Sequence, residues 1–145
     1  MTRARTQVLE CLSSMEVPAS ARQLSAQLGN EHDQATVYRA LHYLEDKGYL
    51  DSFVLHCDAH GTERYFVVRP HRGAGPSAHR HWFHCEVCHR FTDLGQCHLD
   101  ELVAQMGQER GLEIRAHTFY ATGVCRECLS RPPLPLSSFT QGSEH

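Results

Sequence analysis

The stretch His-Arg-His-Trp-Phe-His-Cys-Glu-Val-Cys, residues 79–88, decides how the second half of this chain is expected to fold, together with Cys-Arg-Glu-Cys at residues 125–128. Each Cys-x-x-Cys turn aims two sulfur atoms at one point, and two such turns supply the tetrahedral thiolate set of a structural zinc site. We therefore predict one structural zinc ion bound by Cys85, Cys88, Cys125 and Cys128. Disulfide bonds or a redox-active dithiol are the alternatives.

The composition is typical of a soluble globular protein. Hydrophobic residues make up 41% of the 145 positions, and no apolar run approaches the roughly 18 residues of a membrane span. Nothing resembling a signal peptide opens the chain, so we expect a cytoplasmic protein with reduced thiols and no membrane partner. The net charge is -3, so any contact with DNA must come from individually placed arginines rather than from bulk positive charge.

The first half of the chain shows the element order of a winged helix-turn-helix, in which the third helix enters the major groove of DNA. Apolar residues at helical spacing, capping residues and glycine stops predict three helices, and alternating residues predict two strands around a turn that contains Gly61. The first predicted helix covers residues 2–14. The second begins with a capping box at Ser20 and Gln23 and ends at Gly29, and the third runs from Asp33 to Gly48. The predicted strands cover residues 49–54 and 64–68.

The second half is predicted to be a small α/β unit, which makes the whole chain α+β. A Gly/Pro-rich linker precedes it, and a Pro-rich flexible tail follows it. The patterns predict strands over residues 82–85, 90–94 and 112–120 and a helix over residues 98–109. Three strands and one helix form a core that is too small for a stable monomer. We therefore expect strand edges to pair across a dimer axis.

Residues 35–50, Ala-Thr-Val-Tyr-Arg-Ala-Leu-His-Tyr-Leu-Glu-Asp-Lys-Gly-Tyr-Leu, resemble the recognition helix and turn of the ferric uptake regulator superfamily. Thr2 and Arg5 match its N-terminal Thr-x-x-Arg pattern, and with both cysteine pairs the resemblance covers about residues 2–128. It implies a metal-dependent dimeric transcription factor with an N-terminal winged helix and a C-terminal α/β dimerisation domain. The residues expected to contact DNA are Arg5, Thr36, Tyr38 and Arg39.

A sensor needs a second, weaker metal site besides a closed thiolate site, because the latter stays filled. His79 and His81 lie two apart on a predicted strand, so their side chains project to the same side and can share one ion. The positions that carry the sensory ligands in the family are occupied here by metal-competent side chains. The predicted sensory set is His79, His81, Asp100 and His117.

The other regulatory site of the family, at the hinge, departs from the usual pattern. In the family this site uses two histidines that precede the first cysteine of the first Cys-x-x-Cys turn. Here those two positions hold Arg80 and Trp82. Either this site is rebuilt, or a one-residue bulge before Cys85 shifts His79 and His81 into the hinge role. Asp51 resembles the hinge carboxylate of the zinc uptake regulator branch, so the possible hinge ligands are Asp51, Cys57 and His60.

These features predict a zinc-responsive repressor of metal uptake genes that binds an inverted repeat in double-stranded DNA as a homodimer. Histidine and cysteine ligands with a single carboxylate suit zinc, so the zinc uptake regulator branch fits best. The predicted organisation is a DNA-binding domain over residues 1–68, a linker over 69–78, a metal-binding dimerisation domain over 79–129 and a tail over 130–145.

Three alternatives are weighed against this prediction. Within the same family, the chain could be a sensor of iron, manganese or peroxide. Outside it, the chain could be a zinc-stabilised protein-interaction module that never touches DNA. An enzyme is disfavoured, because the His-x-Glu and Pro-Cys-x-x-Cys signature of a zinc deaminase is absent.

Overall fold

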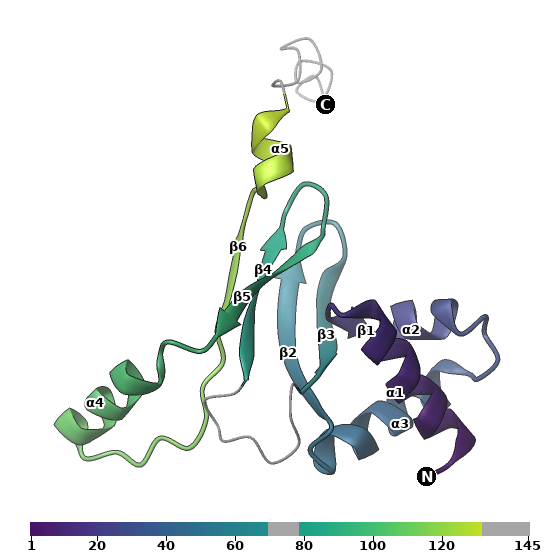
Figure 1. Cartoon of the computed structure of the whole chain (residues 1–145), viewed down its shortest axis with the longest axis horizontal. Helices are drawn as coiled ribbons and strands as arrows, with labels where there is room; N and C mark the ends of the chain where they lie inside the picture. Colours follow the sequence, from purple (N-terminus) through teal and green to yellow (C-terminus); the bar gives the residue numbers. More distant parts are fainter. Residues whose placement is uncertain (70–78, 132–145) are drawn as a thin grey trace.

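The computed structural model of the chain describes residues 1–69 and 79–131. Within these ranges the chain forms a helical unit with a long hairpin, a second sheet beside that hairpin, and two further helices (Figure 1). The expected mixture of helices and sheets is confirmed. The predicted linker apart from Arg69, and nearly all of the predicted tail, fall outside the described residues.

The three helices of the first half begin at capping residues, as the sequence predicts. They are α1 (Arg3–Met15), α2 (Ala21–Gln27) and α3 (Gln34–Asp46). Ser20 and Gln23 form the reciprocal capping box at the start of α2, and Asp33 accepts the backbone N–H of Thr36 at 2.7 Å at the start of α3. These side chains satisfy backbone donors that no helical carbonyl can reach.

The apolar faces of these helices close over one core. Its largest fully buried side chain is Phe66, which comes from the following hairpin. Burying this ring among the apolar residues of the helices joins the helices and the hairpin in one folded unit. The other buried residues of this core are Val8, Leu12, Ala19, Leu24, Val37, Ala40, Leu41, Leu44 and Leu50.

The first sheet is a winged-helix sheet with the order β1-β3-β2. Its strands are β1 (Ala19–Ser20), β2 (Leu50–Cys57) and β3 (Gly61–Val68). The β2–β3 hairpin is longer than predicted, because pairing runs from Leu50 opposite Val68 to Cys57 opposite Gly61. The wing therefore reaches well beyond the helices, up to a turn made by residues 58–60.

The second sheet has the order β5-β4-β6, with β4 in the middle. Its strands are β4 (Arg80–Cys85), β5 (Phe91–Gln96) and β6 (Tyr120–Gly123). β5 pairs antiparallel with β4, while β6 pairs parallel with it. A parallel partner requires a crossover connection, and α4 (Asp100–Arg110) lies within that connection. The short helix α5 (Arg126–Ser130) follows β6.

The predicted strand over residues 112–120 is wrong for most of its length. Only Tyr120 belongs to a strand, and residues 112–119 have no regular secondary structure. Both edges of β4 are already taken, and Leu112 and Ile114 are 57% and 39% exposed. The alternating pattern therefore finds no place beside the middle strand β4 and no buried face within one chain.

The wing packs against the second sheet through aromatic side chains. The ring centroid of Phe53 on β2 lies 6.1 Å from that of Phe91 and 6.2 Å from that of Tyr120. Tyr65 on β3 contacts Phe91 at 5.1 Å. Leu55, Cys57 and Tyr65 form a second small core, against which Phe53 and Phe91 pack.

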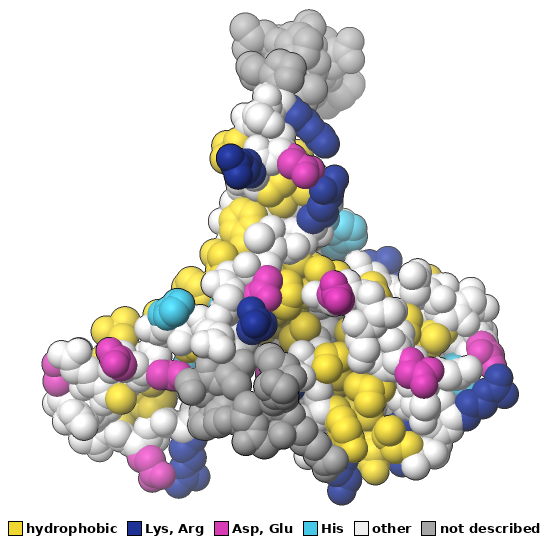
Figure 2. Space-filling view, viewed as in Figure 1, with side chains coloured by type: hydrophobic (Ala, Val, Ile, Leu, Met, Phe, Trp, Pro, Cys, Tyr) yellow, Lys and Arg dark blue, Asp and Glu magenta, His cyan; other side chains and the backbone are white. Residues whose placement is uncertain are grey.

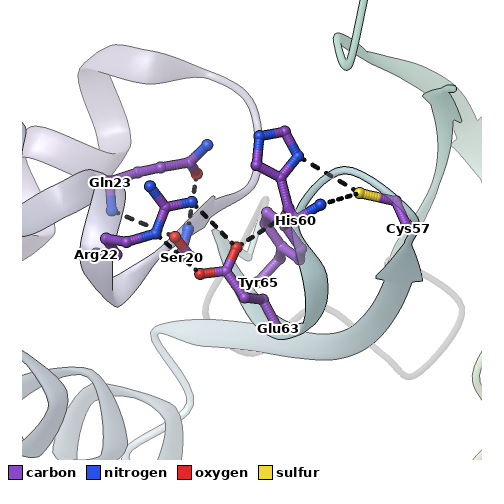
Figure 3. Close-up of polar contacts among 7 residues, drawn as sticks. All are labelled: Ser20, Arg22, Gln23, Cys57, His60, Glu63 and Tyr65. Atoms are coloured by element: carbon purple, nitrogen blue, oxygen red, sulfur yellow. Dashed lines mark hydrogen bonds and ion pairs between the residues drawn. The ribbon is translucent and has the colours of Figure 1, made fainter. Parts of the chain in front are cut away.

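A polar contact ties the wing back to the helices. Arg22 at the start of α2 donates to Glu63 on β3 at 3.2 Å (Figure 3). None of the helices in the two described ranges is long and apolar enough to cross a lipid bilayer.

Replacing the Phe66 ring tests the first core. We expect Phe66→Ala to lower the free energy of unfolding by about 3–5 kcal/mol, because it removes a fully buried aromatic side chain and leaves a cavity. The matched control is Val54→Ala on the neighbouring strand, where the side chain is 44% exposed and a change near zero is expected. Urea unfolding followed by circular dichroism measures both, and equal midpoints for the two variants would contradict this core.

Candidate metal centres

Four sulfur atoms converge where β4 ends and α5 begins. Cys85 Sγ lies 3.8 Å from Cys128 Sγ, and Cys88 Sγ lies 3.7 Å from Cys125 Sγ. With Zn–S bonds of about 2.3 Å, neighbouring sulfurs of a tetrahedral site are separated by roughly 3.8 Å. All four sulfurs lie within 4.8 Å of one another, so this group, the knuckle cluster, fits a zinc ion without rearrangement.

The backbone around Cys85 favours a thiolate. The N–H groups of Val87, Cys88 and Cys125 each donate to Cys85 Sγ at 3.4 Å. Burial opposes ionisation of this thiol, but these three donors lower its pKa to about 5. All seven cysteines of the chain lie in the described ranges and are free, so the described residues contain no disulfide.

A second group of metal-competent side chains gathers at the other end of β4. His79 Nε2 lies 3.2 Å from both His81 Nε2 and His117 Nε2, and Cys97 Sγ lies 3.2 Å from His117 Nε2. Two nitrogens bound to one tetrahedral zinc ion lie roughly 3.3 Å apart. His79, His81, Cys97 and His117, here called the imidazole cluster, therefore have the spacing of a filled ligand set.

His81 is held in the orientation and protonation state that a metal needs. It is 8% exposed on the middle strand, and its Nδ1 donates to the carbonyl of Phe119 at 3.0 Å, which leaves the lone pair on Nε2 facing the cluster. Burial lowers the pKa of His81, while the Phe119 carbonyl and the Asp100 carboxylate act in the opposite direction. The lowered pKa keeps this imidazole neutral, as a ligand must be.

Asp100 lies beside the imidazole cluster, whereas Cys97 lies within it. The structure brings three of the predicted sensory ligands together and adds Cys97, which is not a member of the predicted sensory set. The Oδ2 atom of Asp100 is buried and has no hydrogen-bond partner among the described residues. Asp100 and the three histidines line the same cleft of about 440 Å³, so the carboxylate lies close behind the ligands.

The structure does not bring the three possible hinge ligands together. Asp51 lies at the start of β2 and forms an ion pair with Arg69 at 3.4 Å. Cys57 is six residues further along the same strand, which is about 20 Å away in an extended chain. One ion therefore cannot bind Asp51 together with Cys57 and His60. Asp51 instead faces the cleft that contains the imidazole cluster.

A bulge does interrupt the pairing of β4, but its extra residue lies on β5. Arg80 pairs with Gln96 and Trp82 with Asp93. His81 alone thus faces both Leu94 and Gly95, and Gly95 has a φ of 86° that suits glycine. The spacing of the histidines along β4 is unchanged, so His79 and His81 stay with His117 rather than moving to a hinge site.

Cys57 and His60 lie close to each other at the tip of the wing, where they meet His89 from the knuckle turn. The Sγ of Cys57 is 3.4 Å from Nδ1 of His60. On the second sheet, Asp93 forms an ion pair with Arg80 at 2.9 Å.

The first turns of α3 present the side chains expected to contact DNA. Tyr38 is 43% exposed, and the exposed Arg39 donates to Thr36 Oγ1 at 3.3 Å. The guanidinium of Arg5 stacks 3.5 Å from the ring centre of Tyr43, a cation–π contact that places its charge beside the same helix.

Comparison with known proteins gives one consistent result. The model of the ferric uptake regulator family matches residues 1–122. No curated protein matches the chain.

Solved structures resemble the chain over most of its length at low sequence identity. The ferric uptake regulator of Helicobacter pylori has a TM-score of 0.67 at 15% identity, covering 92% of this chain and 84% of its own. The regulator from Francisella tularensis with iron has a TM-score of 0.65 at 18% identity, covering 90% and 94%. A zinc uptake regulator complexed with zinc and DNA has a TM-score of 0.64 at 21% identity, covering 88% and 82%. At these identities the likeness concerns the fold.

Removing one sulfur tests the knuckle cluster. We expect the unmodified protein to retain one zinc ion during dialysis against EDTA. Cys85→Ser should lose this ion and unfold at lower temperature, because metal binding contributes directly to folding. The control is Cys11→Ser, which changes a thiol on α1 remote from the other cysteines. Elemental analysis and thermal unfolding report both quantities. Unchanged zinc content in Cys85→Ser would rule out the four-sulfur site.

Cobalt binding distinguishes Cys97 from Asp100 as the fourth ligand. In protein whose knuckle cluster is filled with zinc, and in a Cys57→Ser background, we expect one cobalt ion to show thiolate charge-transfer absorption. Cys97→Ser should abolish this absorption, whereas Asp100→Asn should retain it and weaken binding by about tenfold to a hundredfold, as expected of a residue behind the ligands. Absorption that survives Cys97→Ser would exclude the sulfur from the site.

Proposed function

The chain belongs to the ferric uptake regulator family, and from that premise we propose that it is a homodimeric, zinc-responsive repressor of metal uptake genes. Members of this family are metal-responsive transcription regulators. The observation that carries the zinc assignment is the imidazole cluster, which offers three nitrogens and one sulfur within 4.8 Å of one another. Imidazole and thiolate together suit zinc, whereas iron(II) and manganese sites draw more on oxygen ligands.

The imidazole cluster is suited to a sensor because its ligands come from separate parts of the chain. His79 precedes β4, Cys97 follows β5 and His117 lies in the irregular segment before β6. A zinc ion bound here would supply a cross-link between these segments. Asp51 and Arg69, which flank the ends of the wing hairpin, line the same cleft, so ordering the cleft also orders the region where the wing meets the second sheet. Only a preference of the metal for this arrangement can shift the population toward it.

We place the DNA contacts on α3. Its N-terminal half is exposed, with Tyr38 positioned for base edges and Arg39 for phosphates, while Arg5 is oriented by Tyr43 toward the same side. In a two-fold dimer, such helices would read two half-sites about 34 Å apart in an inverted repeat. The likeness to a zinc uptake regulator complexed with zinc and DNA supports this role.

Apolar side chains left exposed in the second half support a homodimer. Figure 2 shows hydrophobic surface on the column formed by the second sheet and α5, and on α4. Patches of this kind on a single chain mark association surfaces, and a two-fold axis lets one patch cover its own copy. The exposed residues are Leu94, Leu102, Met106, Leu112, Ile114, Phe119, Tyr120, Val124 and Leu129.

In this proposal residues 1–68 bind DNA and residues 79–129 bind metal and dimerise. An operator on the chromosome and seven free thiols both fit a cytoplasmic location.

Metal-dependent DNA binding tests the proposal. We expect tight binding to DNA upstream of the chain's own gene and of metal-transport genes only at buffered free zinc. His81→Ala/His117→Ala should weaken binding at least about a hundredfold at the same free zinc, while the knuckle zinc is retained, because two of the four ligands are lost. Tyr38→Ala should abolish specific binding at any zinc level. Fluorescence anisotropy with labelled operator DNA measures all three.

The control for this experiment is His56→Ala, which removes an exposed wing histidine outside the imidazole cluster. Binding that requires iron or manganese instead of zinc would keep the family and overturn the metal assignment. Absence of specific binding with every metal would favour a protein-interaction module.

A further inference from the structure

Cys57, His60 and His89 form a third group of potential ligands, remote from the imidazole cluster. Cys57 is the last residue of β2, and His60 lies in the turn that follows. His89 comes from the knuckle turn, directly after Cys88, with a left-handed backbone at φ 63°. Two of the three side chains thus belong to the wing and one to the second sheet, and all three donor atoms lie within 4.8 Å of one another.

The distances within this group match a metal site. Cys57 Sγ lies 3.4 Å from Nδ1 of His60 (Figure 3), close to the roughly 3.6 Å between sulfur and nitrogen on one tetrahedral zinc ion. The same sulfur accepts the backbone N–H of His60 at 3.2 Å, which holds the two residues together at the tip of the wing. The rings of His60 and His89 are 4.7 Å apart and nearly perpendicular.

Unsatisfied polar atoms next to this group point independently to a ligand. The Nδ1 atoms of His89 and His84 are buried and have no hydrogen-bond partner among the described residues. An unpaired buried polar atom is costly and rare in folded proteins. The ring centroids of His84 and His89 lie 5.4 Å apart. Two buried nitrogens without a hydrogen-bond partner therefore lie close together at the site of Cys57 and His60.

A cavity of about 380 Å³ opens onto these atoms. It is lined by Cys57, His84 and His89, and by two carboxylates, Asp58 and Glu86. Three protein ligands with an accessible fourth position can bind zinc with a water molecule or a carboxylate completing the shell. The thiolate and imidazole donors select a borderline-soft divalent cation over magnesium or calcium, which prefer oxygen.

We propose that Cys57, His60 and His89 form a third metal site, which binds a zinc-type divalent cation and links the tip of the wing to the knuckle turn. Arg22 and Glu63 connect this end of the wing to α2 (Figure 3), so the site joins the DNA-binding helices to the second sheet at a point distinct from the cleft of the imidazole cluster. Its open position makes it weaker than the knuckle cluster. The binding of metal there does not depend on whether the chain binds DNA.

Cobalt titration of full-length protein tests this site. The knuckle cluster is first filled with zinc, and the imidazole cluster is removed by Cys97→Ser/His117→Ala. In this background Cys57 and Cys11 are the thiols left without zinc. We expect one equivalent of cobalt to produce thiolate charge-transfer absorption, and metal analysis of the same sample confirms that the knuckle zinc is retained.

Three variants in this background decide the outcome. Cys57→Ser should abolish the absorption, and His89→Ala should weaken cobalt binding at least about tenfold, because a ligand from the second sheet is lost. His60→Ala, at an exposed position, should do the same without disturbing the small core beneath Cys57. The control Cys11→Ser should leave cobalt binding unchanged.

The proposal is overturned if the background shows no thiolate absorption with cobalt, or if the absorption survives Cys57→Ser. It is also overturned if His89→Ala binds cobalt as tightly as the background, because the site would then be confined to the wing. DNA binding is not measured in this titration, so either proposal can fail without the other.

Discussion

The second half of the chain depends on one geometric requirement, which is that four sulfur atoms meet at the corners of one tetrahedron. Cys85 and Cys88 come from a turn at the end of β4, whereas Cys125 and Cys128 arrive only after α4 and β6. The second sheet has three short strands, and most of the apolar residues of α4 are exposed. Apolar burial within this half is correspondingly small, and a metal bound by the four thiolates would supply the constraint that the core lacks.

The two halves of the chain are joined by the wing rather than by the helices. Phe53 and Tyr65 place their rings against Phe91 and Tyr120 of the second sheet. Metal-competent side chains lie at both ends of this aromatic contact, with the imidazole cluster near the start of β2 and Cys57 near its end. The same hairpin contributes Phe66, the largest fully buried side chain, to the helical core, so it is the element that connects both groups of side chains to the helices.

Local features of this fold were predictable from sequence, whereas contacts between distant segments were predictable only in part. Capping at Ser20 and Asp33 depends on residues three positions apart, so pattern reasoning located those helix starts correctly. The structure brings together the four cysteines, and likewise His79, His81 and His117, which the sequence singles out because their chemistry is distinctive. The place of Cys97 beside His117 depends on the path of the chain between β5 and α4, which no periodicity encodes. Asp51 and Cys57 were combined wrongly because the wing is extended beyond its predicted length, which moves them to opposite ends of one strand.

The parallel pairing of β4 with β6 has a consequence for the order in which the protein is made. β4 and β5 leave the ribosome as a two-stranded hairpin, which is marginally stable in water on its own, while β6 and the second cysteine pair follow only after α4 and the segment 112–119. During that interval Cys85 and Cys88 are thiols without their partners, open to oxidation and to binding other metals. Contacts between residues so far apart in sequence also form slowly. The nascent chain is therefore most vulnerable in the interval between the synthesis of β5 and that of β6.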